Sequence, residues 1–93
     1  MTTASVLGAG SWGTALATVL AQRGIEVRLW CRNPEQAAQM ADSRENGLYL
    51  PGVRLGENII PTDDFNFAVQ SGVILCVIPS AAMADLAVSL AGA

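Results

Sequence analysis

The 93-residue chain contains neither lysine nor histidine, and only 14% of its residues are charged. Five arginines stand against eight acidic residues, which gives a formal net charge of −3. A nucleic-acid-binding surface needs a basic patch along the phosphates, so this composition argues against nucleic acid as a partner. Lysine and histidine are also the side chains best suited to proton transfer near neutral pH. We therefore expect the chain to bind a ligand, and we assign no catalytic residue in it.

The two cysteines, Cys31 and Cys76, form neither a C-x-x-C pair nor a zinc-binding pattern, so we predict no metal site. Each falls in or at the end of an apolar segment, which predicts buried, reduced thiols and a cytoplasmic protein. We expect no secretory signal, because no positively charged leader precedes the short first apolar run. The apolar run at 73–79 is too short to span a bilayer, so we also expect no membrane span.

A glycine motif lies near the N-terminus. Gly8, Gly10 and Gly13 have the G-x-G-x-x-G spacing at the end of a short apolar run, and a segment with helical periodicity, 12–22, follows at once. The pattern indicates dinucleotide binding when a strand precedes it and a helix follows it.

Each of these glycines has a separate expected role. Gly8 permits the tight turn out of the strand, Gly10 lets the backbone approach a pyrophosphate, and Gly13 lets the helix pack against the strand. The unpaired N–H groups and the positive dipole end of the helix would then face the phosphates. The alternative is a glycine-rich turn that serves packing alone.

Apolar periodicity and turn residues predict alternating strands and helices. The expected strands are 4–7, 25–30 and 73–78, and the expected helices are 12–22, 34–44, 65–70 and 81–90. The Pro- and Gly-rich segment 48–62 predicts a loop with one short extended piece at 58–60. This order implies an α/β fold with right-handed crossovers, namely the first βαβαβα half of a Rossmann-type doubly wound parallel sheet.

Individual residues predict where the helices begin and end. Gly24 closes the first helix in a left-handed conformation, and Gly47 closes the second. Asn33 caps the second helix ahead of Pro34, with Gln36 at the spacing of a capping box.

Two burial patterns are also expected. The uninterrupted β-branched run 73–78 predicts a strand covered on both faces. We expect the first helix to bury a stripe formed by Ala15, Leu16, Val19 and Leu20.

The tip of the second strand bears on cofactor choice. NAD-specific folds carry an acidic residue about 20 positions beyond the glycines, whereas an arginine there accommodates the 2′-phosphate of NADP. This chain has Arg32 and Asn33 at that point and no acidic residue. Arg32 is placed to meet a phosphate, and Asn33 to bond a ribose oxygen if its capping role leaves a donor free. The expected cofactor is NADP or NAD, with NADPH favoured; the alternative for Arg32 is an ordinary solvated arginine.

Four segments together resemble bacterial-type NAD(P)-dependent glycerol-3-phosphate dehydrogenases: GAGSWGTALA at 8–17, LWCRN at 29–33, YLPGV at 49–53 and VIPS at 77–80. The resemblance covers nearly the whole chain. It implies a cytoplasmic enzyme of phospholipid biosynthesis that interconverts sn-glycerol 3-phosphate and dihydroxyacetone phosphate. It also implies that residues 1–93 are the N-terminal part of a dinucleotide-binding domain. The catalytic lysines and a helical substrate domain would lie beyond Ala93, and a homodimer is one assembly it allows.

Carried onto matching positions, the resemblance places Ser11 and Trp12 beside the pyrophosphate and Tyr49 near the adenosine end held by Arg32 and Asn33. Pro79 would border the cofactor crevice. The alternatives are that the Trp12 ring only covers the first turn of its helix and that Tyr49 anchors its loop. The expected cofactor-binding residues are Gly8, Gly10, Ser11, Trp12, Gly13, Arg32, Asn33 and Tyr49.

Two other functions fit the same motif. One is another two-domain NAD(P)-dependent dehydrogenase, and the other is a non-catalytic nucleotide-sensing Rossmann module, in which the missing histidine and lysine would be natural. The Ser-Trp segment and the Tyr-Leu-Pro loop have no particular reason to occur together in a sensor. Their presence favours the dehydrogenase.

Overall fold

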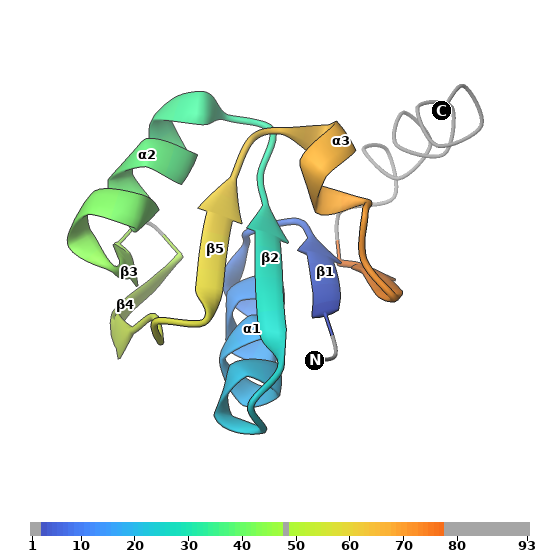
Figure 1. The fold of residues 1–93 in the computed structure, drawn as a ribbon. Coiled ribbons are helices and arrows are strands. Elements are labelled where there is room, and N and C mark those ends of the chain that lie inside the picture. Colours follow the sequence, from blue (N-terminus) through green and yellow to red (C-terminus); the bar gives the residue numbers. More distant parts are fainter. Residues whose placement is uncertain (1–2, 48, 78–93) are drawn as a thin grey trace.

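The computed structural model describes residues 3–47 and 49–77. Four strands form a parallel sheet in the order β5-β2-β1-β6, and β3 and β4 form a separate antiparallel pair (Figure 1). The strands are β1 (Thr3–Leu7), β2 (Glu26–Trp30), β3 (Glu45–Asn46), β4 (Leu50–Arg54), β5 (Ile59–Thr62) and β6 (Val73–Cys76). The helices are α1 (Ser11–Gln22), α2 (Pro34–Ser43) and α3 (Phe65–Ala68).

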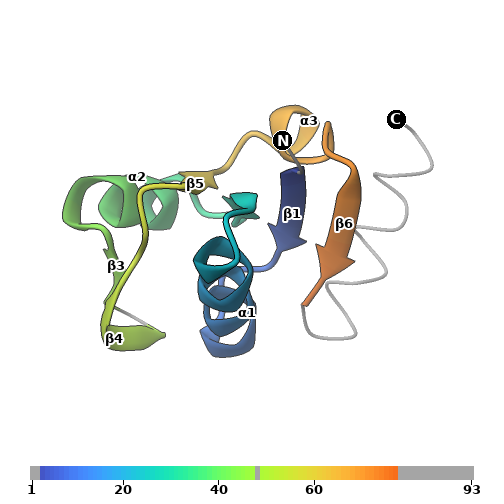
Figure 2. The same cartoon turned by 60° about the horizontal axis from the view of Figure 1, so that its bottom comes forward.

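The order of the strands reverses at β1. The chain moves outward from β1 to β2 and β5, then returns to the other side of β1 to form β6. Helices α1 and α3 lie against opposite faces of the sheet (Figures 1 and 2). This arrangement is the Rossmann-like half that the sequence predicts, and such sheets bind ligands outside the carboxyl ends of the strands at the point of reversal.

Each face of the sheet has its own buried cluster. On one face Val27 and Leu29 of β2 pack with α1 and with Met40 of α2, and all three of these side chains are fully buried. On the other face Trp30 packs with Leu7 and with α3, where its ring meets Phe65 edge-on at 5.5 Å. The two clusters pack around the ends of β1 and β2, and the glycine loop begins at the end of β1.

The segment 48–62 was expected to be mostly loop, but it contributes two strands, of which β5 overlaps the short extended piece predicted at 58–60. β4 pairs with β3, and β5 joins the parallel sheet beside β2, with Ile59 opposite Val27. Ile59 is 1% exposed, so burial of this one side chain favours the strand over the turn signals around it. Among the described strands β5 is at the edge, where a proline such as Pro61 is tolerated.

The buried side of α1 also differs from the expected stripe. Gly13, Thr14 and Ala17 face the sheet. Of the expected stripe, Leu20 does pack against the core, but Val19 is 50% exposed. The reason is the close approach of α1 to the turn after β1 at Gly13, which rotates this narrow row inward.

The end of α2 differs by a few residues from the prediction. α2 ends at Ser43, and Arg44 rather than Gly47 adopts the left-handed conformation, with φ 57°. The Arg44 guanidinium donates to the carbonyls of Gly56 and Ile59, and these bonds hold the residue in that strained region. Gly24 does adopt the left-handed conformation expected after α1, with φ 82°.

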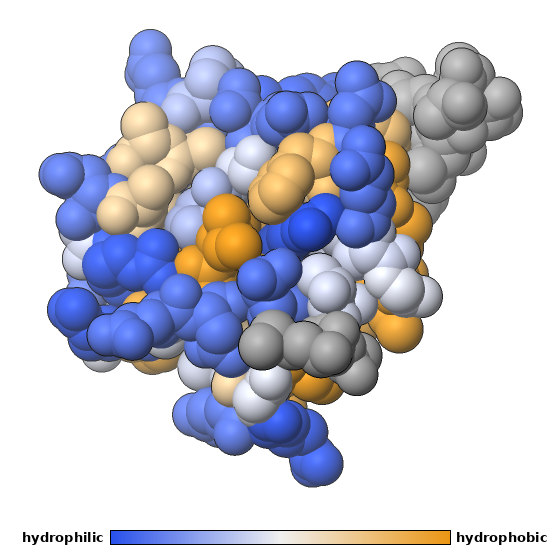
Figure 3. Space-filling model, in the orientation of Figure 1, coloured by the Kyte–Doolittle hydropathy of each residue, from blue (hydrophilic) through white to orange (hydrophobic). Residues whose placement is uncertain are grey.

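β6 is more exposed than expected. Within the described residues it pairs with β1 alone, and Val73 and Ile74 are 46% and 38% exposed. Figure 3 shows hydrophobic side chains along this side of the molecule. Cys76 is exposed too, so the prediction of a buried thiol is wrong there and right for Cys31.

Two expectations fall outside the described residues, namely the place of Pro79 at the crevice and the helix at 81–90. No helix in the described ranges has the length and apolarity needed to cross a membrane.

Candidate functional site

The structure shows a different reason for glycine at each of the three motif positions. Gly8 has φ 123°, a conformation that only glycine adopts readily. A Cβ on Gly13 would lie 1.7 Å from the Gly8 carbonyl oxygen, so close packing of α1 on β1 requires glycine there. Gly10 has an ordinary φ of −79°, and a Cβ on it would meet no atom of the described residues within 4 Å beyond its chain neighbours. The fold explains Gly8 and Gly13 and leaves Gly10 to be explained by something that approaches from outside.

The N-terminus of α1 opens onto the same space. Gly10 is its N-cap, no side chain in the described part of the chain caps it, and its first turn holds no acidic residue. The first backbone N–H groups of a helix have no partners within it, and they combine with the helix dipole to attract anions. The Ser11 hydroxyl is turned to the Tyr49 carbonyl, to which it donates at 2.7 Å.

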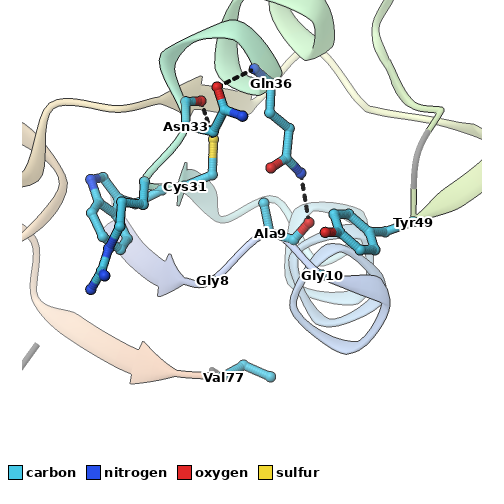
Figure 4. Close-up of a pocket in the computed structure, with 10 residues that line it drawn as sticks. Gly8, Ala9, Gly10, Cys31, Asn33, Gln36, Tyr49 and Val77 are labelled. Carbon is cyan, nitrogen blue, oxygen red and sulfur yellow. Dashed lines mark hydrogen bonds between the residues drawn. The ribbon is translucent and has the colours of Figure 1, made fainter. Parts of the chain in front are cut away.

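Two neighbouring cavities lie at the carboxyl end of the sheet. The first, of about 350 Å³, lies between the glycine loop, the end of β2, Gln36 and Tyr49 (Figure 4). The second, of about 600 Å³, lies between the first turn of α1, Tyr49 and the end of β6. Gly10, Tyr49 and Val77 line both cavities. An elongated ligand that passes over Gly10 would occupy both.

The eight residues predicted to bind the cofactor each line one or both of these cavities, whereas Pro79, expected to border the crevice, lies outside the described residues. The first is lined by Gly8, Gly10, Arg32, Asn33 and Tyr49, and the second by Gly10, Ser11, Trp12, Gly13 and Tyr49. Trp12 is 81% exposed and Tyr49 46% exposed. The two aromatic rings therefore present surface to the cavities rather than to the core.

The tip of β2 combines a helix cap with a cation. Asn33 Oδ1 accepts from the backbone N–H groups of Glu35 and Gln36 at 2.8 and 3.4 Å, as expected of the α2 cap. This cap uses the side-chain oxygen, and the Nδ2 amide can donate elsewhere. Arg32 is exposed beside it on the wall of the first cavity. The two side chains together can bind ribose or phosphate oxygens.

The capping box expected at Gln36 does not form. The Gln36 side chain turns away from the Asn33 backbone and donates from Nε2 to the Ala9 carbonyl at 2.9 Å (Figure 4). A second donor to the same carbonyl, Asn46, was not expected from the sequence. Neither residue carries a local pattern that predicts these contacts, because 27 and 37 positions separate them from Ala9.

Cys31 lines the first cavity as a neutral thiol. Its Sγ–H donates to the Asn33 carbonyl at 3.3 Å. Burial, and to a smaller extent the charge of Asp63, together raise the pKa of the Cys31 thiol to about 11, and the backbone of Asn33 acts in the opposite direction. The thiol is thus protonated at neutral pH and serves as an apolar wall. Across residues 3–47 and 49–77, no three His, Cys, Asp or Glu side chains gather as metal ligands.

Comparison with known proteins gives the family. A family model described as the N-terminus of NAD-dependent glycerol-3-phosphate dehydrogenase matches residues 3–93. A glycerol-3-phosphate dehydrogenase [NAD(P)+] of Moorella thermoacetica is 51% identical over 84 residues, which are 89% of this chain and 25% of that protein. One of Leuconostoc citreum is 46% identical over 92 residues, covering 98% of this chain and 27% of that protein.

A solved structure agrees. The crystal structure of glycerol-3-phosphate dehydrogenase from Coxiella burnetii matches with a TM-score of 0.79 and 41% identity, over 85% of this chain and 25% of that one. The chain thus spans about a quarter of the length of the relatives it matches. On the family match and these identities, the chain belongs to the NAD-dependent glycerol-3-phosphate dehydrogenase family and corresponds to its N-terminal region.

Proposed function

We propose that residues 1–93 are the first part of the dinucleotide-binding domain of an NAD(P)-dependent enzyme. That enzyme interconverts sn-glycerol 3-phosphate and dihydroxyacetone phosphate and serves glycerophospholipid synthesis in the cytoplasm. The observation that carries the proposal is Gly10, a glycine without a packing reason, beside the uncapped N-terminus of α1 at the reversal point of the sheet. Family membership supports the same reading.

In this proposal the chain binds the cofactor along the two cavities. Backbone N–H groups at the start of α1 hold the pyrophosphate over Gly10, where the missing side chain permits close approach. Trp12 flanks the cofactor beside the pyrophosphate, and Tyr49 lies between the two cavities. When bound, the nicotinamide of the cofactor donates or accepts a hydride. Substrate binding and proton transfer are left to residues that follow this chain.

We further propose that NADPH binds at least as well as NADH. The support is local: an exposed arginine, Arg32, stands at the tip of β2, and the segment 29–33 that forms this tip contains no Asp or Glu, the residue types typical of NAD-specific folds. Asn33 assists from its Nδ2 amide, because the helix cap uses only Oδ1.

The test uses the full-length polypeptide, of which we propose this chain to be the first part. Purified protein should oxidise NADPH or NADH when dihydroxyacetone phosphate is added, followed by loss of absorbance of the reduced cofactor. Tight nucleotide binding without turnover of any phosphorylated ketone would favour the nucleotide-sensing module. Turnover of a different ketone alone would indicate another dehydrogenase of the same architecture.

A further inference from the structure

Asn46 is one of the few fully buried polar side chains in the described structure, with 0% of its surface exposed. A buried amide is costly unless its donors and acceptor are satisfied. Asn46 meets this requirement with three contacts. Its Nδ2 donates to the Ala9 carbonyl and to Thr14 Oγ1, each at 2.8 Å, and its Oδ1 accepts from the Tyr49 backbone N–H at 3.3 Å.

These contacts join three separate parts of the site. Ala9 lies inside the glycine loop, Thr14 in the first turns of α1, and Tyr49 in the loop before β4. Tyr49 is tied a second time, since its carbonyl accepts from the Ser11 hydroxyl. The Asn46 side chain is thus bonded to Ala9 and Tyr49, which line the cavities, and to Thr14 of the helix whose N-terminus faces them.

The Ala9 carbonyl receives two donors, Asn46 and the Nε2 of Gln36. The peptide bond between Ala9 and Gly10 is trans, because the described residues contain no cis peptide, so its N–H points opposite to its carbonyl. Two bonds that fix the carbonyl direction therefore also fix the Gly10 N–H direction, towards the open side. They strengthen that N–H as a donor as well, because hydrogen bonds to a peptide polarise it.

Without such support this peptide would be easily rotated, since glycine on one side of it permits many backbone conformations. We infer that Asn46, assisted by Gln36, is a positioning residue for cofactor binding: it holds the Ala9–Gly10 peptide and the Tyr49 loop in the geometry that receives the phosphates. This inference rests on the proposed function. It predicts that substitution of either residue lowers nucleotide affinity by more than a loss of stability alone would explain.

The test compares two asparagines in the full-length enzyme. Asn58 also donates two hydrogen bonds, at the opposite end of the sheet, where its Nδ2 donates to the carbonyls of Ala21 and Ile25 at 2.9 and 2.7 Å. Asn46→Ala and Asn58→Ala should both lower the melting temperature. Only Asn46→Ala should weaken NADPH binding, by about 10-fold or more, equal to about 1.4 kcal/mol. Its KM for NADPH should rise while kcat at saturating cofactor is retained.

Gln36→Met supplies a milder variant, because Gln36 is only half-buried and its loss removes a single donor to Ala9. We expect its NADPH affinity to fall about 3- to 10-fold with little change in melting temperature. If Asn46→Ala does not fold, the NADPH affinity of Gln36→Met alone tests whether the hydrogen bonds to the Ala9 carbonyl support cofactor binding.

The outcomes separate the inference from the proposed function. If the unmodified enzyme binds no nucleotide, the proposed function fails, and the inference fails with it. If the unmodified enzyme binds NADPH and both variants at Asn46 and Gln36 bind it equally well, the inference alone is overturned. Equal loss of affinity in Asn58→Ala would also overturn it, because the effect would then be general destabilisation.

Discussion

Gly10 and Gly13 should respond in opposite ways to the addition of the same methyl group. In Gly13→Ala the new Cβ would lie 1.7 Å from the Gly8 carbonyl oxygen, a backbone atom that cannot turn aside as the end of a side chain could. Relief requires α1 to move away from β1, so we expect a cost at or above the upper end of the roughly 1–3 kcal/mol typical of overpacking.

Gly10→Ala adds its methyl to open space at an ordinary φ of −79°. Alanine is a poorer N-cap than glycine, but it also restricts the unfolded chain, so we expect the free energy of unfolding to change by less than about 1 kcal/mol. The methyl group would occupy the space that we assign to the pyrophosphate. Losing one charge-assisted hydrogen bond of about 1.5–3 kcal/mol corresponds to roughly a 10- to 100-fold loss of nucleotide affinity.

Two measurements on the full-length polypeptide carry this test. Denaturant unfolding reports stability, and fluorescence titration with NADPH and with NADH reports affinity. Gly10→Ala should retain its free energy of unfolding and bind both cofactors more weakly. Gly13→Ala should show mainly a lower free energy of unfolding. Unchanged affinity in a folded Gly10→Ala variant would refute the reasoning about the phosphate site.

Three further predictions concern the tip of β2 and its surroundings. Arg32→Ala should weaken NADPH binding by about 1.5–3 kcal/mol and leave NADH binding nearly unchanged. Arg23→Ala, at another exposed arginine, is the control. An equal loss of affinity for both cofactors in titrations would contradict a role of Arg32 at the 2′-phosphate. Asn33→Ala should destabilise the fold by about 1 kcal/mol through loss of the α2 cap, measured by denaturant unfolding. The pKa of the Cys31 thiol is raised from 9.0 to about 11, so the unfolded chain releases this proton first and stability should fall as pH rises from 9 to 11. Unfolding curves of Cys31→Ala should lack that component, whereas an identical pH slope would count against a buried neutral thiol.

The central features of the fold could be predicted because their signals are local. The glycine spacing, the apolar strand before it and the helical period after it stand within one short stretch, 3–22. Asn33 and Gly24 likewise act on their immediate neighbours, and both do what the sequence indicates. The tip of β2 follows from the chain length between the motif and Arg32. These local signals predicted Gly8, Gly10, Gly13, Arg32 and Asn33 as site residues. The resemblance added Ser11, Trp12 and Tyr49, whereas Gln36 and Val77 also line the cavities and were not predicted.

The remaining features depend on contacts between distant segments. The side of α1 that faces inward is set by the Gly8–Gly13 approach, which periodicity alone does not report. The left-handed Arg44 depends on carbonyls 12 and 15 positions away. Asn46 offered no local signal, since its partner Ala9 is 37 positions earlier and β3 is only two residues long.

The most direct test of the account is a crystal structure of the full-length polypeptide with NADPH bound. The account predicts that the pyrophosphate lies over Gly10 within hydrogen-bond distance of the backbone N–H groups at the start of α1. It also predicts that Asn46 and Gln36 still hold the Ala9 carbonyl from behind. A pyrophosphate bound away from Gly10, with the glycine loop facing solvent, would contradict it.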